Sequence, residues 1–439
     1  MGRSTKHGKI RAEQREMRIE NLRTEKGTHT SRILATVIWE DCDRSTQEVY
    51  FAASGELADS MSCNPNAFLI GCLMPAMRHG EQRIAIDEEV CPELRNGLAT
   101  AMGWICHWYG RPRRPVRLET KPGAPVPGLR ATMHAASFLS GGIDSLATLR
   151  ANRRDFPLDH PNAIRDCLVV HGFDIGGQER TGAEMKSFEQ ALAALSPVAD
   201  DAKVTLIPVS TNIRLLDDDI HFWMYEFHGA ALASIAHALC GRFATAHIAS
   251  TLDIPNLKAW GSHPLLDPNY SSAELQIKHD GTRYSRLDKV RLVAEWPVAL
   301  QNLRVCTENP PGVLNCGRCE KCIRTMTELQ VVGHLAQTDA FPVKMVTTEL
   351  LGSLTITNAY QDSCYRELIV RLKEQGCNDL AEIIERKSVE YHKHLAWQEE
   401  RDWKGAVKRF DRNHLSGGLF GFYNSTRTRL KGAQSSRQA

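Results

Sequence analysis

The chain lacks the features typical of membrane, secreted and strongly basic proteins. Its 439 residues contain no apolar run near 18 residues, the length that a membrane-spanning helix needs. The first residues are polar and charged without an apolar core, so we expect no secretory signal. The formal net charge is only +2, which gives no overall electrostatic reason to expect a nucleic-acid partner. We therefore expect a cytoplasmic protein that works without a membrane or a nucleic acid.

Two common phosphate-binding motifs are also absent. There is no Gly-Lys-Ser/Thr, which excludes a Walker-type loop, and no Gly-x-Gly-x-x-Gly, which argues against a dinucleotide site. The composition that remains is that of an ordinary globular protein, 42% hydrophobic and 24% charged, with length for two or three domains. Its 13 cysteines are expected to be reduced thiols, some of them on a metal.

A glycine-rich stretch between an apolar run and a helical pattern gives the strongest indication of function. Ala135–Leu139 predicts a short buried strand, Ser140–Ser145 a turn, and the apolar spacing after it a helix. Gly141 and Gly142 lack a Cβ, so backbone N–H groups there and at the helix start can approach a phosphate. Both serines add hydroxyl donors. Asp144 fits beside a polyphosphate if Mg²⁺ lies between them. The alternative is a plain turn in which Asp144 or a serine caps the helix.

The hexapeptide Ser-Gly-Gly-Ile-Asp-Ser at 140–145 resembles the PP-loop of the ATP pyrophosphatases. These enzymes cut ATP between the α and β phosphates and place AMP on a substrate oxygen while the loop grips the pyrophosphate. The resemblance implies an α/β fold with a Rossmann-like parallel sheet of the HUP type, and ATP and Mg²⁺ as cofactors. It also implies that Asp144 and Ser145 are catalytic. Lys289, at the start of a Lys-x-x-aliphatic turn, would neutralise phosphate charge, as a lysine commonly does in this family.

Residues 131–300 alternate strand-like and helix-like segments, which predicts a parallel sheet with helices on both faces. The further strands are expected at 166–174, 203–210 and 244–250, and the helices at 182–195 and 223–239. Ligands of such sheets bind at the carboxyl ends of the strands. The resemblance places adenosine at the end of the second strand, so His171, Gly172 and Asp174 are candidate nucleotide contacts. A structural histidine and a helix-capping aspartate are the alternatives.

The long polar segment 255–290 is a candidate substrate loop, because loops of this length in compact domains are often functional. Four candidate substrate residues lie in it: His263, Asp267, Arg283 and Arg286. The two arginines and Lys289 could instead line a solvated face, and His263 and Asp267 could merely cap turns.

Four cysteines follow with the spacing C-x9-C-x2-C-x2-C: Cys306, Cys316, Cys319 and Cys322. Four thiolates within 17 residues match a tetrahedral structural zinc site, in which no coordination position stays open. An iron–sulfur cluster is the competing interpretation.

The loop and the cysteine cluster together, over roughly residues 135–330, resemble the 7-cyano-7-deazaguanine synthase family. That resemblance implies an AMP-forming ligase that adenylates a carboxylate or amide oxygen of a 7-deazaguanine derivative, with ammonia or another amine as acceptor. The chain carries extra regions on both sides, and extended relatives occur in bacterial antiviral operons, so a protein amine is a second acceptor to consider. Two alternatives stay open: a tRNA-modifying thiolase or lysidine-type enzyme, for which Cys167 is the nearby thiol, and a non-catalytic nucleotide-binding scaffold.

The flanking regions are predicted with less detail. Residues 1–29 are expected to form a solvated helix or a disordered tail, because their acids and bases recur at helical spacing. Residues 30–130 are expected to form a separate α+β unit, with strands at 33–39, 48–52 and 80–86 and a helix at 92–108. The ATP-binding unit would span 131–330, and 331–439 would form a helical extension. The oligomeric state is not indicated by the sequence.

Overall fold

The computed structural model describes residues 17–28, 30–54, 60–110, 113–123, 134–173, 175, 182–308 and 312–414. The chain divides into two compact units, Met1–Val346 and Thr347–Ala439. No helix in the described ranges has both the length and the apolar character needed to cross a bilayer.

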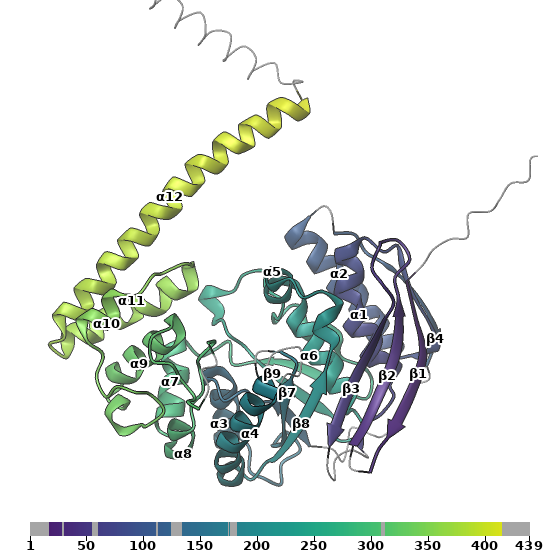
Figure 1. Ribbon diagram of the computed structural model, residues 1–439, viewed down its shortest axis with the longest axis horizontal. Coiled ribbons are helices and arrows are strands. Elements are labelled where there is room, and N and C mark those ends of the chain that lie inside the picture. Colours follow the sequence, from purple (N-terminus) through teal and green to yellow (C-terminus); the bar gives the residue numbers. More distant parts are fainter. Residues whose placement is uncertain are drawn as a thin grey trace, which may run out of the picture. The chain divides into compact units, whose positions relative to one another are not determined.

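The first unit is built on one ten-stranded sheet of the order β10-β9-β6-β7-β8-β3-β2-β1-β4-β5 (Figure 1). Neighbours from β10 to β8 are parallel, the pairs β8–β3, β3–β2 and β2–β1 are antiparallel, and β1–β4 and β4–β5 are parallel. The fold is therefore mixed α/β with a mostly parallel sheet. The strands are β1 Met17–Lys26, β2 Thr30–Ile38, β3 Gln47–Ser54, β4 Arg83–Val90, β5 Arg117–Pro122, β6 Ala135–Phe138, β7 Ile164–His171, β8 Thr205–Thr211, β9 Thr245–Ala249 and β10 Gln276–Asp280.

Helices connect the parallel strands and cover the sheet. The helices α3 and α4 contact each other and the strands β6, β7 and β8, whereas α6 contacts β9 and α1. Right-handed crossovers place α3 and α4 on one face and α6 on the other, because the chain moves from β6 to β8 and then returns past β6 to β9. The helices of this unit are α1 Pro65–His79, α2 Pro92–Tyr109, α3 Ile143–Asp155, α4 Gly182–Ala202, α5 Ile220–Phe222, α6 His228–His237, α7 Arg286–Ala294, α8 Pro297–Gln301 and α9 Glu320–Val331, with a π-helical turn η4 at Trp223–Phe227.

The N-terminal prediction is wrong for the part that the structure describes. Met17–Lys26 forms β1, which pairs with β2 and β4, and not a solvated helix or a disordered tail. Met17 and Ile19 alternate with polar residues and are fully or almost fully buried, so the period-2 apolar pattern outweighs the helical spacing of the charges. Residues 1–16 lie outside the described ranges.

The strands expected at 33–39, 48–52 and 80–86 occur as β2, β3 and β4, and the expected helix at 92–108 occurs as α2. These elements and those of 131–300 belong to the same sheet, because β3 pairs antiparallel with β8 through registers such as Phe51 with Thr211. The position near residue 130 that was predicted as a domain boundary therefore lies within one compact unit. Its connector is described only as far as residue 123.

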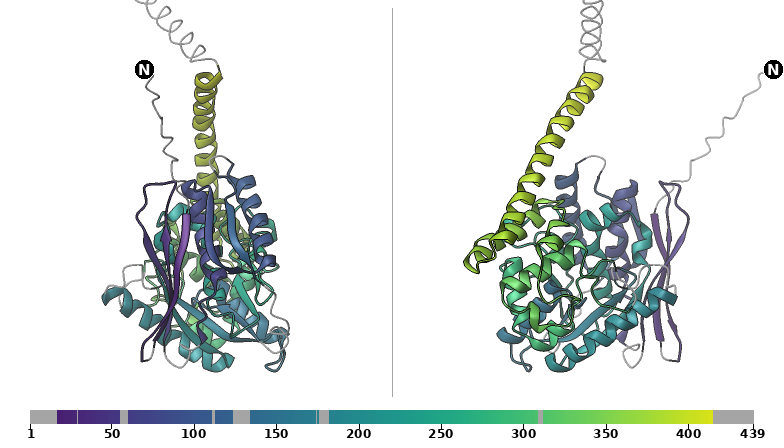
Figure 2. Two further views of the ribbon diagram at one scale, coloured as in Figure 1. Left: turned by 90° about the vertical axis from the view of Figure 1, so that its right-hand side faces the viewer. Right: turned by 60° about the vertical axis from the view of Figure 1, so that its left-hand side comes forward.

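The second unit is helical, and its helices are α10 Thr348–Gly352, α11 Ala359–Glu374 and α12 Asn378–His414. Figure 2 shows α12 as one long continuous helix. It packs against α11 through buried apolar side chains that include Leu368 and Ile384. A buried carboxylate, Asp362, accepts hydrogen bonds from the Ser388 hydroxyl at 2.5 Å and from His392 at 3.1 Å, which ties the two helices together.

Candidate active site and metal centre

The glycine-rich loop has the predicted strand–turn–helix geometry. β6 ends at Phe138, and α3 begins at Ile143 with Gly142 as its N-cap. The two serines hold the turn: Ser140 N donates to Ser145 Oγ at 3.2 Å, and Ser145 Oγ donates to Gly142 O at 3.1 Å. The turn thus stands at the carboxyl end of β6, which has β7 on one side and β9 on the other, the switch point where open α/β sheets bind ligands.

Gly141 is required by both its conformation and its surroundings. Its φ is +79°, a left-handed conformation that side chains disfavour. A Cβ there would lie 3.3 Å from Arg304 Cβ and 3.4 Å from Leu195 Cδ2. Arg304 N also donates to Gly141 O at 2.9 Å. Since Arg304 lies two residues before Cys306, the cysteine segment is attached directly to the loop.

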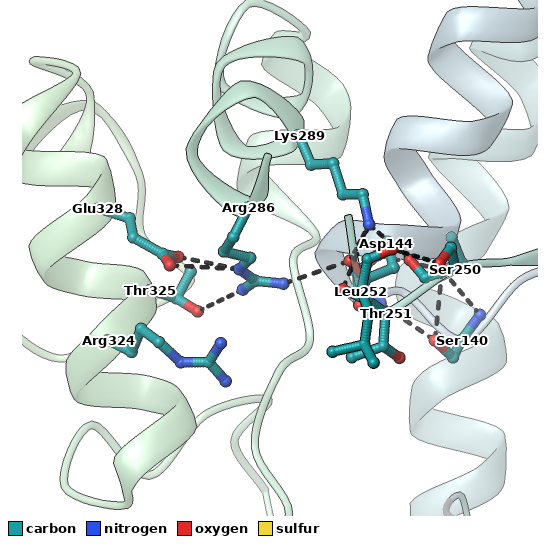
Figure 3. A network of polar contacts seen from close by, with 12 residues as sticks. Ser140, Asp144, Ser250, Thr251, Leu252, Arg286, Lys289, Arg324, Thr325 and Glu328 are labelled. Carbon is teal, nitrogen blue, oxygen red and sulfur yellow. Dashed lines mark hydrogen bonds and ion pairs between the residues drawn. The ribbon is translucent and has the colours of Figure 1, made fainter. Parts of the chain in front are cut away.

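Two cations from the start of α7 face Asp144 at the first turn of α3 (Figure 3). Lys289 Nζ lies 3.3 Å and Arg286 Nη1 lies 3.6 Å from Asp144 Oδ1. Lys289 is 2% exposed, and its ammonium also donates to Ser250 O at 2.5 Å and, more weakly, to Thr251 O at 3.4 Å. The ammonium therefore joins the end of β9 to the start of α3, beside the loop where phosphate is expected.

Arg286 is in turn held by α9, the helix that begins within the cysteine cluster. Its guanidinium donates to both carboxylate oxygens of Glu328 at 3.1 and 3.3 Å and to Thr325 Oγ1 at 3.1 Å. Burial raises the pKa of Glu328, while the neighbouring Arg286 favours the ionised form. Glu328 and Thr325 were not among the sequence candidates, although their i, i+3 spacing on a helix next to the cysteines was a usable signal.

Two of the residues predicted at the end of β7, His171 and Gly172, pack closely against neighbouring segments. His171 is 1% exposed and packs edge-to-face on Phe188 with ring centroids 5.1 Å apart. Gly172 has φ of +106°, and a Cβ there would clash with the carbonyl oxygen of Thr211. Asp174 lies outside the described residues. A nucleotide contact at this strand end stays a prediction.

The segment 255–290 is organised by Asp267, which is fully buried. Its carboxylate accepts from Ser262 Oγ at 2.6 Å, from His279 Nδ1 at 2.8 Å and from His263 N at 3.2 Å. His263 itself accepts from the Leu265 amide and packs on a tryptophan of α2, and burial lowers its pKa. Asp267 thus stabilises the segment 255–290 through hydrogen bonds to residues of the same segment.

Arg283 is not brought to the glycine-rich loop. It is exposed and pairs with Asp155 at 2.9 Å. Asp155 lies eleven residues after Asp144 on α3, so this ion pair is roughly 17 Å along the helix from the loop. Of the four candidates in this segment, Arg286 is the one that the structure brings to Asp144.

A cavity of about 90 Å³ opens at the carboxyl end of β9. Its lining combines aliphatic, aromatic and polar residues: His228, Leu232, Ile248, Ala249, Ser250, Thr251, Leu252, Leu257, Trp260, Ser262 and His279. Ser250 and Thr251, whose carbonyls bind Lys289, form part of this wall. The cavity at the end of β9 and the glycine-rich loop at the end of β6 are therefore linked through Lys289, which contacts Ser250, Thr251 and Asp144.

The four predicted cysteines converge into one cluster whose geometry suits a metal ion. Their sulfur atoms all lie within 4.8 Å of one another, and two pairs, Cys306 with Cys319 and Cys316 with Cys322, are 3.9 Å apart. A tetrahedral zinc site with Zn–S bonds of about 2.3 Å needs sulfur separations of about 3.8 Å. The donor set and its spacing therefore fit a metal ion such as zinc.

The backbone around the cluster is shaped for this arrangement. Gly317 has φ of +73°, and a Cβ there would clash with Pro342. The amides of Arg318 and Cys319 point at Cys316 Sγ, at 3.4 and 3.3 Å. The buried Asn315 side chain accepts from the amide of Cys306 at 3.2 Å and fixes the chain on both sides of the cluster. Asn315 was also missed in the sequence, where a lone asparagine beside a cysteine gives no pattern.

Comparisons with protein-family models, curated proteins and solved structures found no significant match for this chain. The fold and the site define a mixed α/β protein with a mostly parallel ten-stranded sheet, a glycine-rich strand–turn–helix loop and a four-cysteine cluster whose geometry suits a metal ion.

Proposed function

We propose that the chain is a PP-loop ATP pyrophosphatase, with the Rossmann-like sheet of the HUP type, that acts as an AMP-forming ligase. The observation that supports this best is the constellation at Asp144. A carboxylate at the first turn of α3 follows a Gly141 turn and is faced by the two cations Lys289 and Arg286. A carboxylate and two cations serve a ligand that brings both a metal ion and phosphate charge, as Mg–ATP does.

Each part of the site has a role in this proposal. The N–H groups of the loop and of the first turn of α3 bind the β and γ phosphates. Asp144 would hold Mg²⁺, which neutralises phosphate charge when bound. Lys289 and Arg286 stabilise the negative charge that grows on the departing pyrophosphate. The reaction joins a substrate oxygen to the α-phosphorus, breaks the bond to the β-phosphate oxygen and releases pyrophosphate. An amine then displaces AMP and loses a proton.

The substrate that we propose is a 7-deazaguanine derivative whose carboxylate or amide oxygen is adenylated, with ammonia or a protein amine as acceptor. Zinc in the four-cysteine cluster would be structural, since four thiolates leave no open position. The thiolase alternative is weakened by Cys167, which is fully buried, and burial raises the pKa of its thiol far above neutrality. A thiol in that state is neither accessible nor ionised, as a nucleophile must be.

Product analysis tests this proposal. The purified chain is incubated with ATP labelled at the α-phosphate, Mg²⁺, 7-carboxy-7-deazaguanine and ammonia. We expect labelled AMP and an equal amount of unlabelled pyrophosphate, and both should form only when the deazaguanine is present. Release of ADP and phosphate, or ATP binding without turnover in the presence of any tested acceptor, would contradict the ligase and favour another nucleotide-dependent role. Asp144→Asn should abolish the Mg²⁺-dependent turnover.

A further inference from the structure

One histidine that no pattern in the sequence singled out lines the cavity at the end of β9. His279 lies on β10, and its side chain is 3% exposed. Its Nε2 has no hydrogen-bond partner among the described residues, although the atom is buried. A buried polar atom without a partner is costly, so in a native protein it calls for an explanation such as a ligand, an ion or a water molecule.

The other ring nitrogen of His279 is fixed by Asp267. Nδ1 lies 2.8 Å from Asp267 Oδ2, and an ionised carboxylate only accepts hydrogen bonds. Nδ1 of the neutral ring therefore carries the proton, and Nε2, on the opposite edge, presents a lone pair. Ser262 Oγ, which donates to the same carboxylate at 2.6 Å, helps to hold Asp267 in this orientation.

The side chain of His279 lies on the same face of the sheet as the cavity. His279 pairs in parallel register with Ile248, so their side chains point to the same face, where α6 also contributes to the lining. The remaining walls include Leu252, Leu257 and Trp260, which are apolar or aromatic. At about 90 Å³ the cavity is several times larger than one water molecule needs. These walls favour a small flat apolar ring that carries a hydrogen-bond donor.

We propose that His279 is a substrate-recognition residue whose Nε2 accepts a hydrogen bond from a ring N–H of the substrate. The inference rests on the proposed function, because Ser250 and Thr251 connect this cavity to Lys289 and the phosphate loop. A ring held at His279 can extend its reactive oxygen past the end of β9 towards the α-phosphate. Asp267 is the positioning residue that keeps the ring of His279 in its acceptor tautomer.

The neighbouring strand offers a matched control. His247 on β9 is buried, has Nδ1 2.9 Å from Asp280 Oδ2, and also has an unpartnered Nε2, but it does not line the cavity. His279→Asn and His247→Asn both replace the Nδ1 donor with an amide and remove Nε2. Only the first change removes an acceptor from the cavity. His279→Gln, whose amide oxygen can reach the position of Nε2, is the conservative variant.

The probe is 7-carboxy-7-deazaguanine, and its binding to the full chain is followed by calorimetry without ATP. Removing an acceptor that leaves a buried donor unpaired is expected to weaken binding on the order of 10- to 100-fold in His279→Asn. The affinity for Mg–ATP should change by less than about twofold, His247→Asn should bind the probe like the natural chain, and His279→Gln should recover part of the loss.

The outcomes separate this inference from the proposed function. If the natural chain binds the probe and forms AMP with it, while both His279 variants bind it as well as His247→Asn does, the role of His279 is overturned and the ligase stands. If the natural chain neither binds the probe nor forms AMP, the proposed substrate and the role of His279 fall together. If His279→Asn fails to fold, His279→Gln decides: unchanged binding and Michaelis constant for the deazaguanine overturn the role.

Discussion

Replacing Lys289 with methionine tests how the two halves of the candidate site are joined. Methionine keeps most of the volume of the buried stem but removes the ammonium. The ammonium contacts Asp144 at 3.3 Å and Ser250 O at 2.5 Å from a side chain that is 2% exposed. Hydrogen bonds to a charged group are worth about 1.5–3 kcal/mol each. The loss at Asp144 is smaller than this full value, because Asp144 keeps its contact with Arg286 and some contact with solvent. We expect Lys289→Met to lower the free energy of unfolding by about 2–4 kcal/mol.

The same variant should slow the ATP reaction. If Lys289 stabilises the charge on the leaving pyrophosphate, its loss should reduce kcat by roughly 100- to 1000-fold, the usual effect of removing one preorganised donor. The assays are urea unfolding followed by tryptophan fluorescence and release of labelled AMP.

Arg291→Met on the same helix is the matched control. Its ion pair with Asp288 at 2.7 Å joins side chains that are 33% and 45% exposed, so its loss should cost about 1 kcal/mol or less. Equal stability and equal AMP release in Lys289→Met and Arg291→Met would refute the reasoning about Lys289.

Three further predictions concern the loop, the metal and pH. Gly141→Ala should lower the free energy of unfolding by about 1–2 kcal/mol and weaken ATP binding, whereas Gly80→Ala, at φ of +78° but with open space around it, should show the strain alone without the ATP effect. Elemental analysis should find about one zinc per chain, and Cys319→Ser should lose it together with ATP affinity, because Arg304 joins the cluster to the loop; iron with a visible absorbance band would overturn the zinc assignment. Burial lowers the pKa of His237 from 6.5 to about 4, so the stability from keeping it neutral is present above pH 6.5 and is lost as pH falls towards 4. In urea unfolding at pH 7 and 4.5, His237→Gln should therefore lose about 2–3 kcal/mol less stability than the natural chain, and equal losses would contradict this.

The structure of the loop could be predicted from the local sequence because the residue types there favour one conformation. Two glycines between an apolar run and a helical pattern leave few conformations other than a strand–turn–helix, which the structure confirms for Ala135–Asp155. The cysteine spacing was equally specific, since four thiols within 17 residues are rarely found together for a purpose other than binding a metal.

What the sequence could not provide was the arrangement of distant segments. The single sheet depends on the antiparallel pairing of β3 with β8, which joins residues about 160 positions apart and leaves no local signal. The same limit applies to Glu328, which matters only because α9 packs beside α7 and presents it to Arg286. For β1, the helical spacing of charges was misleading, since it reflects the exposed side of a strand whose buried side is set by Met17 and Ile19.

The most direct measurement of the central claim follows an oxygen atom. 7-Carboxy-7-deazaguanine labelled with ¹⁸O in its carboxylate is incubated with the chain, ATP, Mg²⁺ and ammonia, and the AMP is analysed by mass spectrometry. If the carboxylate attacks the α-phosphorus, AMP carries one ¹⁸O from the substrate after the amine displaces it. Unlabelled AMP, or ADP in its place, would contradict an adenylating site at Asp144 and the Ser140–Ser145 loop.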